Sequence, residues 1–434
     1  MQTTSIKNSL KNNSGFRPFI TASVVSNVGT EVTGIALPLV AITLLNASNS
    51  WVAIIEGASS VALMLVGLQI GLLVDRRNRR TLLIASDVVG AITIAAIPIL
   101  WLTESLNTIW VLAAAIILAI AGNIHDVASD TVMPALVPRN DLCRANGVYA
   151  SSRSVAEVSG AGIGGILISG LGLFAGLILD ALSFITSAFL LMRLPHTVLG
   201  STGSGVEVES SIRATTIQRL KASWKDMLEG FTIYRKDVRL RYILGSSLTS
   251  NIFSTMAGMV ELLFLIRVLE VPAWGVGLAV SVTAVGGIMG GVLNSWFLSK
   301  LGPHKIMAFS QLVLNAPILL LPFAFSGIGV TFYIVAWFFY SFSSVIYASA
   351  VITYRQTIVP EDLLGRVGAT SRWINSVAIA ATAAITATLL LEVSILTVVI
   401  VSSVGIYLSG FWLLNKHFLK SSTPSQAEIS EEHR

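Results

Sequence analysis

The chain has 434 residues, of which 54% are hydrophobic and only 12% are charged, and its mean hydropathy is +0.78. Soluble globular proteins carry about a quarter charged residues, so this composition excludes an ordinary water-exposed surface and indicates a chain embedded in a bilayer. A single cysteine and the absence of a glycine period exclude disulfide-framework and collagen-like classes. The net charge of +5 is first a signal of membrane topology, and no nucleic-acid partner is expected.

Twelve apolar runs separate the polar segments, and each is long enough for a transmembrane helix, which needs about 20 residues. The predicted helices cover residues 18–45, 50–74, 80–103, 108–137, 142–169, 172–193, 239–267, 274–299, 304–325, 328–358, 362–391 and 394–415. The sequence therefore predicts an all-α membrane protein with twelve transmembrane helices.

Basic residues gather in every second loop. The loop between the second and third helices holds Arg76, Arg77, Arg79 and Arg80, whereas the loops of the opposite side hold Arg267 as their one basic residue. Loops rich in Lys and Arg stay in the cytoplasm. We therefore expect a multi-pass protein of the cell (inner or plasma) membrane with both termini in the cytoplasm.

A polar segment in the middle of the chain divides the helices into two groups of six. It contains a predicted amphipathic helix that we expect to lie on the membrane surface, with partner binding as the alternative. The predicted organisation is an N-terminal tail (1–17), a six-helix half (18–193), a linker (194–238), a second six-helix half (239–415) and a C-terminal tail (416–434).

A short repeat relates the two halves. Val137-Pro138, Leu142, Arg144 and Ser154-Val155-Ala156 recur 222 residues later as Val359-Pro360, Leu364, Arg366 and Ser376-Val377-Ala378. A repeat in the same register after six helices indicates two pseudo-repeated halves in parallel orientation, which is the layout of one large transporter class.

The loop Gly71-Leu72-Leu73-Val74-Asp75-Arg76-Arg77-Asn78-Arg79-Arg80 resembles the G-x-x-x-D-R-x-G-R-R loop of the major facilitator superfamily. Asn78 stands where that family has Gly, and we expect it to keep the turn because both residues tolerate a left-handed backbone. The arginines are expected to anchor in anionic headgroups, and Asp75 to act as a latch between conformations. The predicted gating loop is Gly71, Asp75, Arg76, Arg79 and Arg80, with Arg366 in a loop of the second half.

Further segments resemble the drug and macrolide efflux branch of that superfamily, namely Pro134–Pro138, Asp180–Phe184, Glu229–Phe231 and Pro360–Arg366. The resemblance implies a monomeric secondary transporter that exports small amphipathic compounds, antibiotics among them, in exchange for protons by alternating access. No cofactor or metal is expected, and no P-loop occurs that would use ATP. The alternatives are a proton-driven importer or a siderophore or lipid transporter of the same fold, and a membrane-embedded enzyme, at which only His125-Asp126 hints.

Glycines of the fifth predicted helix form a second family-like element. Gly160, Gly164 and Gly165 are similar to the glycine motif of superfamily antiporters, with Ala161 in place of its proline. Small residues at this spacing let helices approach closely. Close packing and a role in gating both remain open.

Eleven ionisable residues lie at membrane depth, where each costs about 3 kcal/mol or more and is a candidate functional site. They are Glu31, Glu56, Asp87, His125, Asp126, Asp130, Arg153, Glu157, Asp180, Glu261 and Arg372. Glu31 lies roughly 20 Å along its helix, near the midplane, with no basic residue within a helical turn. It is our first choice for proton coupling or for contact with a cationic substrate, and a local hydrogen bond is the alternative.

Two pairs of these residues share helix faces. Asp126 and Asp130 are four residues apart, as are Arg153 and Glu157, so an ion pair between the two helices is plausible; its role is either functional or structural neutralisation. In the resembled fold the first, fourth, seventh and tenth helices line the cavity, which adds Glu261. Asp87 and Asp180 belong to outer helices and are expected to brace the loop or the packing.

Overall fold

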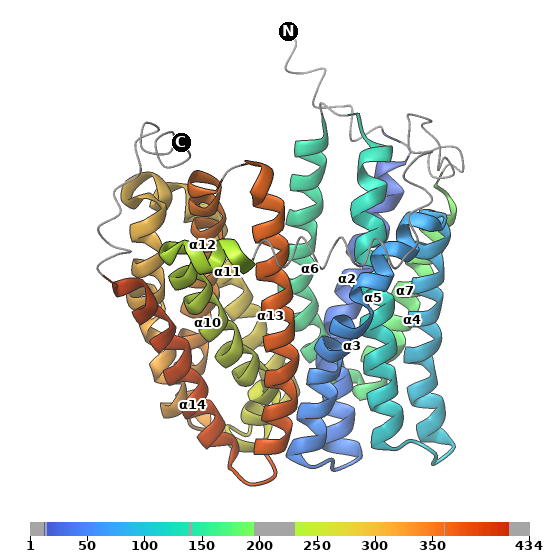
Figure 1. Ribbon diagram of the computed structural model, residues 1–434. Helices are drawn as coiled ribbons and strands as arrows, with labels where there is room; N and C mark the ends of the chain where they lie inside the picture. Colours follow the sequence, from blue (N-terminus) through green and yellow to red (C-terminus); the bar gives the residue numbers. More distant parts are fainter. Residues whose placement is uncertain (1–12, 14, 139–140, 195–230, 360, 416–434) are drawn as a thin grey trace. The chain divides into compact units, whose positions relative to one another are not determined.

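The computed structural model of the chain describes residues 13, 15–138, 141–194, 231–359 and 361–415, and within them all regular secondary structure is helical (Figure 1). The first group of helices is α2 (Phe16–Leu39) with the π-helix η1 (Val40–Leu44), α3 (Asn49–Arg76), α4 (Arg79–Leu102), α5 (Thr108–Leu136), α6 (Leu142–Leu171) and α7 (Leu173–Met192). The second group is α10 (Val238–Leu263) with η3 (Phe264–Val268), α11 (Ala273–Phe309) with η4 (Ser310–Leu314), η5 (Ala316–Phe323), η6 (Gly327–Gly329), α12 (Val330–Ile358), α13 (Glu361–Leu389), α14 (Ile395–Leu408) and η7 (Ser409–Leu414).

Within the described residues, ten helical segments are long and apolar enough to cross a membrane. The longest of them covers Ala273–Phe323 and contains Gly302, whose φ of 72° breaks the helix just before Pro303. This segment therefore divides into two crossings. A further helix, α13, has 29 residues and is about 43 Å long at 1.5 Å per residue. The predicted twelve-helix, all-α membrane fold is confirmed.

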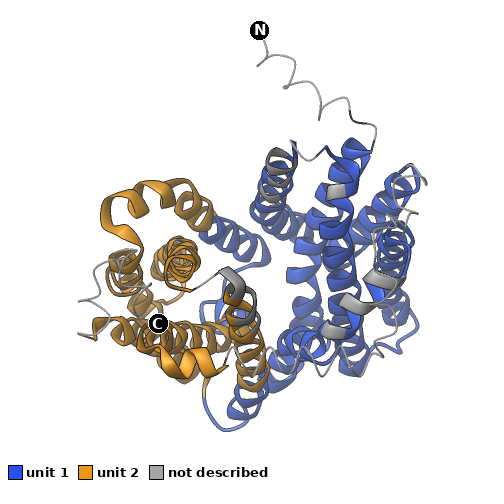
Figure 2. Cartoon of the chain, turned by 45° about the horizontal axis from the view of Figure 1, so that its top comes forward, with its two compact units in different colours: residues 1–204, 261–284, 383–393 blue, residues 205–260, 285–382, 394–434 orange. Residues whose placement is uncertain are grey.

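The chain separates into two compact units, coloured blue and orange in Figure 2. Unit 1 contains residues 1–204, 261–284 and 383–393, and unit 2 contains residues 205–260, 285–382 and 394–434. In unit 1, α2 packs against α6 and α7, while α5 packs against α3 and α4. The predicted linker (194–238), which holds the expected amphipathic helix, falls mostly outside the described residues.

The close packing of α2 depends on small side chains along its buried face. Ala22, Ser23, Ser26 and Gly29 are all buried there. At Gly29 an added Cβ would collide with side-chain oxygens of Asp180 and Ser183 on α7. Small residues allow helices in a membrane to approach closely, so this face brings α7 and its carboxylate next to α2.

Two π-helices repeat the same local structure in the two sequence halves. The second, η3, follows η1 by 224 residues, and each ends two residues before a residue with left-handed backbone. These residues are Asn46, with φ 47°, and Glu270, with φ 53°. The offset is close to the 222 residues of the sequence repeat, so the pseudo-repeat extends to the detailed helix ends.

The turn at Asn78 differs from our expectation. Its backbone is extended, with φ −62° and ψ 117°, and its side chain accepts hydrogen bonds from the backbone N–H groups of Arg80 and Thr81. The prediction of a left-handed turn at this residue is wrong. Asn78 instead caps the N-terminus of α4, where Asn is among the most favourable residues.

Candidate functional site

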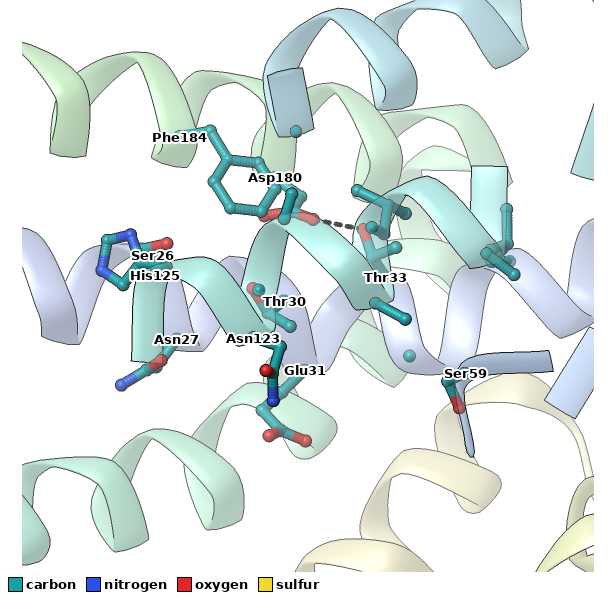
Figure 3. Close-up of a pocket in the computed structure, with 18 of the residues that line it drawn as sticks. Ser26, Asn27, Thr30, Glu31, Thr33, Ser59, Asn123, His125, Asp180 and Phe184 are labelled. Carbon is teal, nitrogen blue, oxygen red and sulfur yellow. Dashed lines mark hydrogen bonds between the residues drawn. The ribbon is translucent and has the colours of Figure 1, made fainter. Parts of the chain in front are cut away.

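A cavity of about 390 Å³ lies within unit 1 and is lined by residues of α2 to α7 (Figure 3). Carboxylates reach it from five of these helices. They are Glu31, Glu56, Asp87, Asp126 and Asp180, and the basic side chains that line the cavity are Arg153 and His125. The cavity therefore concentrates acidic groups inside the membrane-spanning helices.

Glu31 lines this cavity from α2, beside Asn27 and Thr30 of the same helix (Figure 3). Two charged groups of α6 act on its carboxylate, because Glu157 repels it and Arg153 attracts it. The sequence shows no basic residue near Glu31 on its own helix. The structure supplies one from another helix, so Glu31 is not electrostatically isolated.

Arg153 also forms an ion pair with Asp126, one of the two acids of the fourth predicted helix. Its Nη2 lies 3.4 Å from Oδ2 of Asp126 on α5, and both side chains are substantially exposed, at 56% and 41%. The ion pair between the fourth and fifth predicted helices is thus present. Asp130 and Glu157 are exposed and are not among the residues that line the cavity.

Glu56, one of the eleven ionisable residues predicted at membrane depth, lines the cavity from α3. Its Oε1 is buried and has no hydrogen-bond partner among the described residues. Glu261 of α10 repels its carboxylate but does not itself line this cavity. Of these two acids, Glu56 lines the cavity of unit 1.

Asp87 and His125 form a pair that sequence reasoning missed. The Nδ1 atom of His125 lies 3.1 Å from Oδ1 of Asp87, whose side chain is 1% exposed. The Oγ atom of Ser86 lies 3.4 Å from the same ring nitrogen. The Oδ2 atom of Asp87 has no hydrogen-bond partner among the described residues. Asp87 thus lines the cavity and, through His125, also links α4 to α5.

Asp180 occupies a hydrogen-bonded niche at the edge of the same cavity. Thr33 of α2 donates to its Oδ2, the dashed bond in Figure 3, and Ser183 donates to its Oδ1 over 2.9 Å. These two hydroxyls orient the carboxylate toward α2. The position of Asp180 follows from the close α2–α7 contact at Gly29, which no pattern within α7 reveals.

The three predicted glycines hold α6 against two different helices. A Cβ at Gly160 would lie 2.6 Å from Cβ of Glu31, and one at Gly164 would lie 3.1 Å from Cα of Val32. Gly165 faces α11, where an added Cβ would lie 2.9 Å from Cα of Gly277. Two of the glycines therefore fix the position of Glu31 and its neighbour, and the third brings α6 onto α11 within unit 1.

Two arginines of the predicted gating loop donate to backbone carbonyls of neighbouring helices. Arg80 is buried and donates from Nε to the carbonyl of Leu191 over 3.2 Å and from Nη2 to that of Met192, at the C-terminus of α7. Arg79 donates to the carbonyl of Thr131 over 3.3 Å. The expectation that Arg80 anchors in headgroups is wrong, because it is enclosed by protein. The remaining loop residues, Gly71, Asp75, Arg76 and Arg366, lie outside the described side chains.

Residues 19–383 match the Major Facilitator Superfamily. The chain belongs to this superfamily. It is therefore a multi-span membrane transporter for small molecules and not an enzyme. The chain is 27% identical over 209 residues to the multidrug efflux pump Tap of Mycolicibacterium fortuitum, and the match covers 47% of this chain and 50% of that pump, so it spans half the length of this relative.

Solved structures of low sequence identity share the fold. The nucleoside transporter NupG is 12% identical with a TM-score of 0.71, and the comparison covers 94% of this chain and 99% of that one. A bacterial homologue of the iron transporter ferroportin in the inward-facing state is 15% identical with a TM-score of 0.71, over 92% and 97% of the two chains. Transporters of different substrates thus have this architecture, and the substrate has to be argued from the cavity itself.

Proposed function

We propose that this protein is a secondary active transporter that exports small amphipathic cations, macrolide-like or other drugs, in exchange for protons by alternating access. The observation that carries the proposal is the set of five carboxylates lining one cavity in unit 1. Each ionised acid at membrane depth costs about 3 kcal/mol or more. Such a set is expensive for stability alone and fits a site that binds positive charge.

The same carboxylates explain why export and proton uptake would be coupled. A carboxylate can hold either a proton or the ammonium group of a substrate, so binding of one favours release of the other. The inward proton gradient would then drive export of the substrate. The similarity to Tap, a multidrug efflux pump by name, supports the outward direction and the drug-like substrate.

Within the cavity we assign the coupling role to Glu31. It lines the cavity from α2, and it shares Arg153 with Asp126, since Arg153 attracts Glu31 and pairs with Asp126 at 3.4 Å. When Glu31 is neutral, the positive charge of Arg153 interacts with Asp126 and no longer with Glu31. A proton on Glu31 therefore changes which acids are available to a cationic substrate.

We further propose that the protein acts as a monomer in the cell membrane with both termini in the cytoplasm. The orientation is supported by the basic residues of the loop that begins α4 and by their scarcity on the opposite side, where Arg267 lies. Cysteine labelling at the termini of intact cells tests it, and labelling from outside would contradict it.

Glu31→Gln tests the coupling role, with Asp130→Asn as the matched control because Asp130 is an acid at membrane depth outside the cavity lining. In a host stripped of its own pumps, we expect at least tenfold less export of cationic antibiotics and dyes by Glu31→Gln at normal expression, and near-normal export by Asp130→Asn. In proteoliposomes, substrate should release protons from the wild-type protein and not from Glu31→Gln.

Three results would contradict the proposal at different points. Wild-type export by Glu31→Gln would show that another acid couples transport. Export that persists after a protonophore collapses the proton gradient would remove the antiport mechanism. Gradient-driven accumulation inside the cells would favour the importer.

A further inference from the structure

A second cavity, of about 430 Å³, lies entirely within unit 2 and is lined by α10, η4, α12 and α13. Its polar lining consists almost wholly of amides and hydroxyls. They include Asn251, Gln311, Asn315, Tyr340, Tyr347 and Asn375. Arg355 is the one charged residue among those lining it in the described part of the chain. Its chemistry is thus unlike that of the acidic cavity in unit 1.

Two polar atoms at this cavity are buried without a partner. Asn315 is 1% exposed, and its Nδ2 donates to Oε1 of Gln311 over 3.2 Å, while its Oδ1 has no hydrogen-bond partner among the described residues. The Nε of Arg355 is likewise buried and unpaired there. A buried polar atom without a hydrogen-bond partner is unfavourable. One acceptor and one donor therefore remain for a ligand to satisfy.

Other side chains of the lining are held in fixed positions. Asn251 donates from Nδ2 to Oδ1 of Asn375 over 2.7 Å, and Asn375 donates to the carbonyl of Ser371 over 2.8 Å. Ser247 and Tyr347 are joined by a hydrogen bond of 3.0 Å between their hydroxyls. These bonds orient amide and hydroxyl groups before any ligand binds, which reduces the entropy cost of binding.

The unpaired atoms decide which ligand chemistry fits. An ionised carboxylate or a phosphate diester only accepts hydrogen bonds, so it would satisfy Arg355 and leave Oδ1 of Asn315 unpaired. A hydroxyl group both donates and accepts and can satisfy both. We propose that this cavity binds an uncharged, hydroxyl-rich group, such as a glycosidic or polyol part of the transported compound. The inference rests on the proposed function and adds a second point of recognition for those exported cations that carry such a group.

The test compares two cations on the purified full-length protein by equilibrium dialysis. Erythromycin carries a protonated amine and several sugar hydroxyls, whereas tetraphenylphosphonium has no hydrogen-bonding group. Asn315→Leu keeps the side-chain size and removes the amide. We expect this variant to raise the Kd for erythromycin at least tenfold and to change that for tetraphenylphosphonium less than twofold.

Asn294→Leu is the matched control. Asn294 is an amide of unit 2 that donates to Ser349 over 2.6 Å and does not line the cavity, so its variant should bind both compounds normally. If Asn315→Leu does not fold, Asn251→Leu takes its place with the same expectation. Equal weakening of both compounds, or of neither, would overturn the inference, as would displacement of erythromycin by inorganic phosphate.

Binding and export together separate this inference from the proposed function. A wild-type protein that exports tetraphenylphosphonium and fails to bind erythromycin contradicts only the inference about unit 2. A protein that binds erythromycin through Asn315 and exports no compound of the panel contradicts only the proposed function.

Discussion

Gly160 brings α6 so close to α2 that any side chain at this position must move Glu31. A Cβ at Gly160 would lie 2.6 Å from Cβ of Glu31 and 3.0 Å from the carbonyl oxygen of Val28. Nonbonded carbons are most favourable at about 3.5–4.0 Å. Both Cβ atoms are fixed to the backbone, so no change of rotamer can relieve the contact, and the two helices would have to separate by about 1 Å.

We therefore expect Gly160→Ala to lower the free energy of unfolding by about 1–3 kcal/mol, the usual cost of overpacking, and to reduce export because Glu31 moves with its helix. Gly147→Ala is the control on the same helix. An added Cβ there meets no atom within 4 Å, so this substitution should stabilise the protein by roughly 0.5–1 kcal/mol through helix propensity.

Unfolding in mixed detergent micelles, followed by intrinsic fluorescence, gives the two free energies, and the drug-export assay gives the functional effect. If Gly160→Ala proves as stable as Gly147→Ala and exports normally, the close approach at Glu31 is not a constraint on the protein. Loss of export in both variants would show that the effect does not arise from the contact with Glu31.

Two further predictions concern local interactions. His125→Ala should lower the free energy of unfolding by about 1–3 kcal/mol, because it leaves the buried Asp87 without its hydrogen-bonding partner, and the double variant with Asp87→Asn should recover part of this loss; no recovery in the same micelle assay would contradict the pairing. Asn78 is the N-cap of α4, so the free energy of unfolding should fall by a few tenths of a kcal/mol in Asn78→Gly and by about 1 kcal/mol in Asn78→Ala. An Asn78→Gly variant more stable than the wild type would instead support a left-handed turn at this position.

The helices were predictable because each apolar run ends at polar residues that mark its boundary. The predicted helices at 108–137 and 328–358 correspond to α5, Thr108–Leu136, and α12, Val330–Ile358. Transmembrane helices must satisfy their own backbone hydrogen bonds, so the apolar run fixes the element without tertiary contacts. The cap at Asn78 does not follow from the family motif, because a glycine at that position indicates a left-handed turn, whereas the Asn78 side chain accepts hydrogen bonds from the first turn of α4.

The site was less predictable because helices that are apolar all round do not reveal which face meets the cavity. Asp87 and Asp180 were assigned to outer helices, and only the approach of α4 to α5 and of α7 to α2 brings them to the cavity. One signal was available in the sequence. Asp87 lies about 12 Å from the start of α4 and His125 about 17 Å from the end of α5, and an acid and an imidazole at similar depth are natural partners.

The contrast between the two cavities bears on how one substrate could be exchanged for protons. If both cavities were lined by carboxylates, a cationic substrate would displace protons at two places, and its binding would depend on pH throughout. In this chain the acids line the cavity of unit 1, and uncharged amides and hydroxyls line most of that of unit 2. On the proposed function, the uncharged groups would recognise the substrate at any proton concentration, and the exchange of substrate for protons would be confined to the acids around Glu31.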